Sequence, residues 1–164
     1  MDDENGNYDF LMFNDLDFDH PDVVAEMERW GVWVARELDL DGMRLDALKH
    51  IEDRFIAGFM DAVRRERGEA FYAVGEYWKD GFEALEKYLD DVVGHKVNLF
   101  DVPLHYKLFE ASQKGRDYDL TNLLDQTLVT AYPTLAVTFV DNHDSQRGSS
   151  LESQVKAWFK PLAY

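Results

Sequence analysis

Short apolar runs of strand length alternate with helix-like segments along most of this 164-residue chain, and this alternation is the strongest constraint on its fold. The apolar runs lie at about residues 43–47, 71–78, 97–104 and 135–140. Apolar periodicity and capping residues predict helices at about residues 21–38, 51–67, 81–89, 104–111, 120–129 and 151–163. Strands that alternate with helices predict an α/β fold with parallel strands and right-handed crossovers.

Two architectures are compatible with four such strands. They can form a small doubly wound sheet, or they can form half of a (β/α)8 barrel, which needs eight strands. In both cases ligands bind at the carboxyl ends of the parallel strands. Residues 1–20 are different, because they are loop-like and rich in aspartate.

Polar side chains follow the apolar runs at the end where such a site is expected. A lone acid at a strand end is usually a cap or turn residue, but several clusters at successive strand ends indicate a functional site. The first run ends in Arg44, Asp46, Lys49 and His50, the second ends in Glu76, Tyr77 and Trp78, the third carries Asp101 and His105, and the fourth ends in Asp141, His143 and Asp144.

Carboxyl groups that converge from neighbouring strand ends suit the cleavage of a glycosidic bond. One of them then holds a proton and acts as the acid, while another stays ionised and acts as the nucleophile. Arg44 lies two residues before Asp46 on the first strand, so both side chains point to the same side. Its guanidinium is expected to keep Asp46 ionised and in place.

The composition excludes several classes of partner. The net charge is −16, from 33 acidic and 17 basic residues, which argues against binding to nucleic acid or to an anionic membrane. No apolar run approaches transmembrane length. Without cysteine the chain has no disulfide or thiolate metal site. Aromatic residues make up 14% of the chain, and such rings can stack on sugars.

Three segments resemble the motifs of the alpha-amylase family of glycoside hydrolases: DGMRLDALKH (41–50), VGEYW (74–78) and FVDNHD (139–144). Longer stretches look like the liquefying alpha-amylases of bacilli, among them DLDFDHPDVV (15–24), FDVPLH (100–105) and SLESQVKAWFKPLAY (150–164). The resemblance implies a partial TIM (β/α)8 barrel that covers about strands 4 to 7 with their helices. Residues 1–20 would end an insert domain, and residues 21–164 would form half of the catalytic barrel.

The resemblance also implies a role for each motif residue. Asp46 would be the nucleophile, Glu76 the general acid and base, and Asp144 the carboxylate that binds sugar hydroxyls and helps to distort the ring. The substrate-binding residues would be Arg44, Lys49, His50, Tyr77, Trp78 and His143. The implied reaction is retaining endo-hydrolysis of α-1,4-glucosidic bonds in starch, glycogen or maltooligosaccharides.

The acidic segment before the first helix is the candidate metal site. Carboxylate oxygens on a loop are typical Ca²⁺ ligands, although a solvated acidic turn is the commoner case. The resemblance implies a calcium ion held by Asp9, Asp15 and the backbone carbonyl of His50. Asp17 and Asp19 match ligands of a second calcium ion.

Other readings stay open at the level of sequence. The chain could be a maltooligosaccharide-forming amylase, or a glucan-binding remnant without turnover. An incomplete barrel would leave apolar side chains partly exposed, namely Met43, Leu45, Phe100, Val102, Val137 and Phe139, and self-association through the open barrel edges is therefore a hypothesis. The resemblance implies an extracellular protein, although the acidic first residues are unlike a signal peptide.

Overall fold

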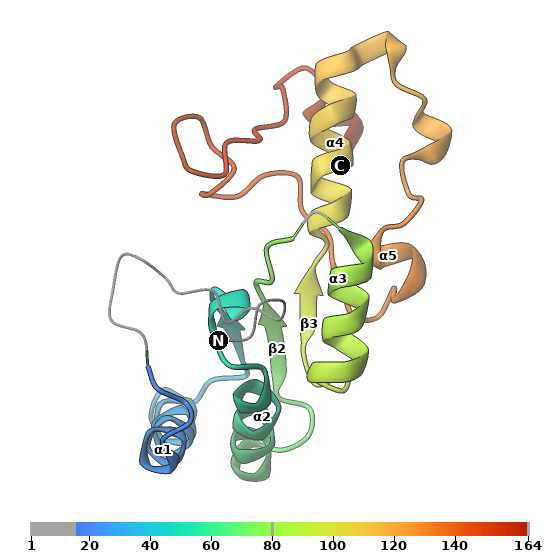
Figure 1. Cartoon of the computed structure of the whole chain (residues 1–164). Helices are drawn as coiled ribbons and strands as arrows, with labels where there is room; N and C mark the ends of the chain where they lie inside the picture. Colours follow the sequence, from blue (N-terminus) through green and yellow to red (C-terminus); the bar gives the residue numbers. More distant parts are fainter. Residues whose placement is uncertain (1–15, 80, 164) are drawn as a thin grey trace. The chain divides into compact units, whose positions relative to one another are not determined.

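The computed structural model describes residues 16–79 and 81–163, which divide into two compact units (Figure 1). Unit 1 contains the described residues up to Trp78 together with Glu86–Asn98. Unit 2 contains the described residues of the segment 79–85 and those from Leu99 onward. Each unit has its own pair of parallel strands, so the predicted α/β class is confirmed.

Unit 1 consists of two helices beside a parallel strand pair. Its elements are α1 (Pro21–Glu37), β1 (Gly42–Leu45), the 3-10 turn η1 (Leu48–His50), α2 (Asp53–Arg67), β2 (Tyr72–Gly75) and the π-helical turn η2 (Tyr88–Val92). Strand β1 pairs with β2 in parallel register, from Gly42 opposite Tyr72 to Leu45 opposite Gly75. Helix α3 (Phe82–Lys87) begins in unit 2 and ends in unit 1.

The two long helices of unit 1 pack closely because α1 has a glycine at the contact. A Cβ atom on Gly31 would lie 2.2 Å from Cε2 of Phe59 on α2. Helix α2 supplies most of the core, with Phe55, Ile56, Phe59, Met60 and Val63 buried. On α1 only Gly31 and Ala35 are buried, while Trp30 and the C-cap residue Leu38 are exposed although both are apolar.

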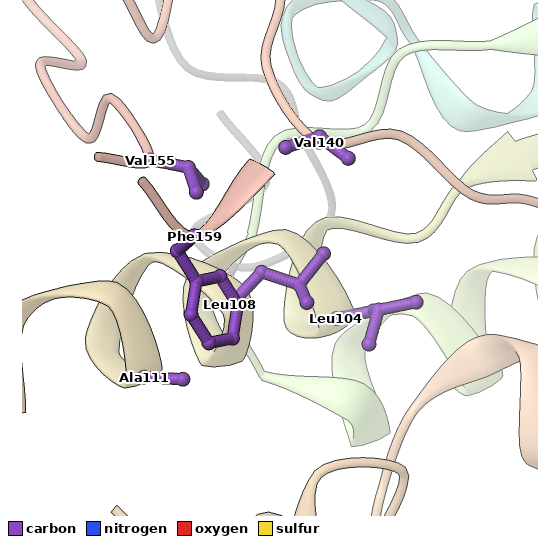
Figure 2. Close-up of a cluster of buried hydrophobic side chains, with 6 residues drawn as sticks. All are labelled: Leu104, Leu108, Ala111, Val140, Val155 and Phe159. Carbon is purple, nitrogen blue, oxygen red and sulfur yellow. The ribbon is translucent and has the colours of Figure 1, made fainter. Parts of the chain in front are cut away.

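Unit 2 is built around one helix and contains little other regular structure. Its elements are β3 (Asn98–Phe100), which starts at the last residue of unit 1, α4 (Val102–Lys114), the 3-10 turns η3 (Gly115–Asp117) and η4 (Leu120–Asn122), α5 (Leu128–Ala131), β4 (Ala136–Val137) and α6 (Lys160–Ala163). Strand β3 pairs in parallel with β4. Three residues of α4 pack against apolar side chains that follow β4 in the sequence, and together they form a buried cluster of Leu104, Leu108, Ala111, Val140, Val155 and Phe159 (Figure 2).

The third predicted strand, at residues 97–104, is wrong at its carboxyl end, because α4 begins at Val102. The carboxylate of Asp101 caps this helix by accepting the Leu104 N–H at 3.1 Å, and Pro103 fits the first turn. As a result Val102 is fully buried rather than partly exposed. The other five side chains predicted to be partly exposed are half-buried.

The helix predicted at residues 120–129 is wrong. The Asp119 carboxylate accepts hydrogen bonds from the Thr121 N–H and hydroxyl, which favours a turn. Gln126 has a left-handed backbone with φ of 49°, so a regular helix cannot pass through it. Within this segment only the 3-10 turn η4 and the first residues of α5 are helical.

The helix predicted at residues 151–163 is present only as α6. Its first half has few local hydrogen bonds, because several N–H groups bind distant acceptors instead. The N–H of Ser153 donates to the Ser145 carbonyl, that of Val155 to Asp141 Oδ1, and that of Lys156 to the Ser112 hydroxyl. These long-range bonds hold the backbone of residues 151–159 in an irregular path.

Across residues 16–79 and 81–163, every helix is too short or too polar to cross a bilayer.

Candidate active site

The carboxyl ends of β1 and β2 place the first two candidate acids on neighbouring strands. Leu45 and Gly75 are register partners, and Asp46 and Glu76 follow them directly. Backbone bonds extend the pairing past the strand ends, from the Glu76 N–H to the Leu45 carbonyl at 2.8 Å and from the Leu48 N–H to the Glu76 carbonyl at 2.9 Å. The backbone around both acids is therefore fixed.

The Glu76 side chain is bound by the turn that carries Asp46. Glu76 is only 8% exposed, and its Oε2 accepts the N–H of Ala47 at 2.8 Å. Ala47 has a left-handed backbone with φ of 52°, which is unfavourable for a residue with a Cβ atom. Sparsely populated conformations of this kind cluster at functional sites, and here the conformation accompanies the contact of Ala47 with the Glu76 carboxylate.

The Asp46 carboxylate has a different environment. It is 69% exposed and forms an ion pair with the Arg44 guanidinium, as the two-residue spacing predicts. Arg44 Nη2 also lies 4.0 Å from Glu76 Oε2, so one cation faces both carboxyl groups. A solvent-accessible carboxylate beside a buried carboxyl group is the division of environments that two-carboxylate mechanisms use.

The other predicted site residues of unit 1 fall into two groups. Lys49 and His50 lie in η1 and are half-buried, directly after the Asp46 turn. Tyr77 and Trp78 are buried, and the Tyr77 ring stacks on Tyr88 with 4.3 Å between centroids. These two rings help to form the core, and contact between them and a sugar remains a prediction.

The third candidate acid, Asp144, lies in unit 2 on a tight turn after β4. The Asn142 side-chain oxygen accepts the N–H groups of Asp144 at 3.0 Å and Ser145 at 2.9 Å. Such a side-chain bond two residues ahead is typical of asparagine in turns. The His143 Nε2 lies 3.2 Å from Asp144 Oδ2, and both side chains are accessible to solvent.

A buried polar network supports this turn, and of its residues only His105 and Asp141 belong to the polar clusters visible in the sequence. His105 of α4 contacts the Val140 carbonyl through Nδ1 at 2.7 Å and the Ser153 hydroxyl through Nε2 at 2.9 Å, and its ring stacks on Phe139. Burial lowers the pKa of His105, although the Val140 carbonyl and Asp141 oppose this effect. Ser145 and Ser153 were missed, because nothing local in the sequence indicates their distant partners.

The predicted calcium ligands do not form a metal site within the described residues. Asp9 and Asp15 lie outside the described ranges. Asp17 Oδ1 accepts the Asp19 N–H at 3.1 Å, and Asp19 Oδ1 lies 3.0 Å from the Arg54 guanidinium. Residues 16–79 and 81–163 contain no group of three or more histidine or acidic side chains placed to hold a metal ion. Because Asp9 and Asp15 are needed for the predicted calcium site, the site stays a prediction.

Parallel strands with acidic side chains after their carboxyl ends are typical of enzymes with a (β/α)8 barrel. Comparison with solved structures agrees. The crystal structure of an Anoxybacillus alpha-amylase matches with a TM-score of 0.66 and 27% sequence identity, over 80% of this chain and 29% of that one. The predicted fold, part of a TIM barrel, is confirmed.

Residues 2–162 match the family described as alpha amylase, catalytic domain, and the chain belongs to this family. It is 55% identical over 98% of its length to an alpha-amylase of Bacillus licheniformis. It is 51% identical over its whole length to a glucan 1,4-alpha-maltohexaosidase of Bacillus sp. (strain 707), and 45% identical to a cytoplasmic alpha-amylase of Escherichia coli (strain K12). The chain spans 31%, 32% and 33% of these three relatives, about a third of their length.

Proposed function

We propose that this chain is the part of an alpha-amylase catalytic domain that cleaves internal α-1,4-glucosidic bonds of starch and related glucans, with retention of configuration. The observation that carries the proposal is the placement of Asp46 and Glu76 at the ends of paired strands, with Arg44 facing both carboxyl groups. Membership of the family supports it.

The proposed mechanism uses the two carboxyl groups in turn. Asp46 attacks the anomeric carbon while Glu76 gives its proton to the departing glycosidic oxygen, which leaves a glycosyl-enzyme ester. Glu76, now ionised, then takes a proton from water as the water attacks the same carbon, and Asp46 leaves as a carboxylate. In retaining enzymes the two carboxyl groups lie about 5–5.5 Å apart, so that separation is expected here.

The remaining site residues would bind the sugar. Asp144 would accept hydrogen bonds from sugar hydroxyls, and His143 would donate to them. In unit 1, Arg44 would hold the Asp46 carboxylate in place through their ion pair, and Lys49 with His50 would contact the sugar on the leaving-group side. Tyr77 and Trp78 would line the groove, which requires part of their buried ring surface to become accessible.

Hydrolysis of a blocked maltoheptaoside by the purified chain tests this function. Asp46→Asn and Glu76→Gln should each lower kcat/KM by at least about a thousandfold. Asp41→Asn is a matched control, because it removes one exposed carboxylate just before the same strand. Binding of the oligosaccharide without turnover would favour the glucan-binding alternative, and a single short product would indicate a maltooligosaccharide-forming enzyme. Equal activity in all variants would overturn the proposed roles.

Calcium binding, an extracellular location and the two-part division at residue 20 are also proposals. Calcium would require Asp9 and Asp15 in addition to Asp17, Asp19 and the carbonyl of His50. If it binds, removal by a chelator should lower the thermal unfolding midpoint of the chain, and added Ca²⁺ but not Mg²⁺ should restore it. An unchanged midpoint would contradict the calcium proposal. The proposed extracellular location follows the resemblance to the liquefying amylases of bacilli, whereas another relative is named a cytoplasmic alpha-amylase.

Self-association is proposed from an apolar groove in unit 1. A groove of about 480 Å³ lies beside β1 and is lined mainly by apolar side chains, including Met27, Trp30, Met43 and Phe55. A second copy of the chain could cover it, but two chains of net charge −16 repel each other. Association should therefore increase with salt concentration, which light scattering measures. A monomer at every salt concentration would overturn this proposal.

A further inference from the structure

Lys160 at the start of α6 contacts the turn that carries Asp144, and the proposed mechanism gives it no role. Its Nζ lies 2.6 Å from Oδ2 of Asp141, whose side chain is only 14% exposed. The other oxygen of Asp141 accepts the Val155 N–H at 2.9 Å and faces the Ser145 hydroxyl at 3.3 Å. Asp141 is thus a largely buried anion that pairs with one cation, accepts the Val155 N–H and lies beside the Ser145 hydroxyl.

Asp141 is linked to the turn of Asp144 through the Ser145 hydroxyl, which lies 3.3 Å from Asp141 Oδ1 and 3.1 Å from the Asn142 carbonyl. The Ser145 hydroxyl, which faces Asp141, lies 3.0 Å from the Asn142 N–H and accepts it. The side chain of Asn142 in turn accepts the N–H of Asp144. Lys160, Asp141, Ser145 and Asn142 therefore form one chain of contacts that ends at the backbone of Asp144.

The position of Lys160 is itself fixed by apolar packing. Its neighbour Phe159 and the nearby Val155 belong to the buried cluster on α4, where Figure 2 shows both side chains directed toward Leu108 and its neighbours. The Lys160 backbone is therefore anchored on the helix of unit 2, and its ammonium group reaches the turn from a rigid support.

We propose that Lys160 is a positioning residue for Asp144 in the reaction proposed above. Without the cation, the Asp141 carboxylate would turn toward water and release the Ser145 hydroxyl and the Val155 N–H, since a largely buried anion without a counter-charge is unfavourable. The turn would then loosen, and Asp144 would no longer present its carboxylate to the sugar in one orientation.

The chain offers a matched set of variants. Lys160→Met removes the charge and keeps the length of the side chain, and Lys160→Arg restores a cation. Lys156→Met removes a charge from an exposed lysine four residues earlier in the same segment. Each protein is assayed for kcat and KM on a blocked maltoheptaoside and for amide hydrogen exchange at Asp144 and Ser145.

We expect Lys160→Met to lower kcat by about tenfold to a hundredfold with KM changed less than twofold, because misplacement of a positioning group acts mainly on the reacting geometry. Amide exchange at Asp144 and Ser145 should become about tenfold faster. Lys160→Arg should bring both measurements to within about twofold of the parent, and Lys156→Met should change neither. If Lys160→Met fails to fold, Asp141→Asn removes the same ion pair.

The two readouts separate the failure of this proposal from the failure of the proposed function. A lower unfolding midpoint with unchanged kcat and unchanged exchange would show that the ion pair only stabilises unit 2, and the positioning role would be overturned. If the parent chain does not hydrolyse the substrate, the proposed function fails, and amide hydrogen exchange alone then tests the positioning role of Lys160. In that case, faster amide exchange in Lys160→Met that Lys160→Arg reverses would support the positioning role although the proposed function has failed. Unchanged exchange in Lys160→Met would overturn the positioning role as well.

Discussion

The two units hold their candidate acids by different means. In unit 1, Asp46 and Glu76 follow strands that pair over four residues each, and backbone hydrogen bonds continue beyond the strand ends. In unit 2, β4 has only two residues, and the turn with Asp144 depends on side chains that bind backbone groups, both nearby at Asp144 and distant at Val155. The difference shows that paired strands fix the backbone of an acid through regular hydrogen bonds, whereas the turn with Asp144 relies on side-chain contacts.

The largest loss of stability is expected at Asp101, where unit 2 relies on one side chain for two buried contacts. The Asp101 carboxylate accepts the N–H groups of Leu104 at 3.1 Å and Val129 at 2.8 Å, and the residue is fully buried. Asp101→Ala should lower the free energy of unfolding by about 3 kcal/mol, because both donors lose their partner. Asp101→Asn keeps one acceptor and should lose about half as much. Equal losses in the two variants, measured by urea unfolding, would contradict this account.

A somewhat smaller loss of stability is expected from a substitution at Gly42, where the backbones of two strands of unit 1 approach closely. A Cβ atom at Gly42 would lie 2.7 Å from the Tyr72 carbonyl oxygen, so the strands would have to separate locally. Gly42→Ala should therefore cost about 2 kcal/mol of unfolding free energy. Gly81→Ala is the control, because no atom lies within 4 Å of its added Cβ. A neutral Gly42→Ala would show that β1 and β2 tolerate looser pairing.

The network of unit 2 should also respond to pH through His105, whose pKa is lowered by burial from its ordinary value of 6.5. The unfolded chain binds a proton at this residue at higher pH than the folded chain does. Stability is therefore complete above about pH 6.5 and is lost as the pH falls toward the lower pKa of the folded state. His105→Asn should be less stable than the parent at pH 8, and the difference should narrow at acidic pH. Parallel unfolding curves for the two proteins at all pH values would exclude this role.

The smallest effect is expected for an exposed ion pair in unit 1. Lys96 Nζ contacts Asp61 Oδ2 on the surface of α2, and about half of the Asp61 side chain is exposed. Asp61→Asn should change the unfolding free energy by less than about 0.5 kcal/mol, because water and salt screen such pairs. Asp141→Asn should lower the unfolding free energy several times more than Asp61→Asn does. A comparable loss in the two variants would show that the Asp141 pair is no better protected than a surface contact.

The fold of unit 1 could be predicted well from the sequence, because its signals are local. His20 and Pro21 mark the start of α1, Gly68 marks the end of α2, and the apolar runs mark β1 and β2 within a few residues. The ion pair between Arg44 and Asp46 followed from strand geometry alone. Contacts between residues that are close in sequence can be predicted, because they depend on local sequence patterns.

Unit 2 was predicted less well, because its structure depends on distant partners. The helix expected at residues 151–163 fails where Val155 and Lys156 donate to Asp141 and Ser112. No local sequence pattern indicates these hydrogen-bond partners, which lie 14 and 44 residues away in the sequence. The motif around Asp144 identified the candidate acid, but the residues that hold its turn became visible only in the structure.

The contact between Ala47 and Glu76 has a consequence for the direction in which a proton can leave. Oε2 of Glu76 accepts the Ala47 N–H, and an oxygen that carries a proton is the poorer acceptor. The neutral carboxyl group therefore favours the tautomer with its hydrogen on Oε1. The two oxygens of Glu76 are thus chemically unequal before any ligand arrives, and if Glu76 acts as the acid proposed above, Oε1 is the oxygen expected to give up the proton.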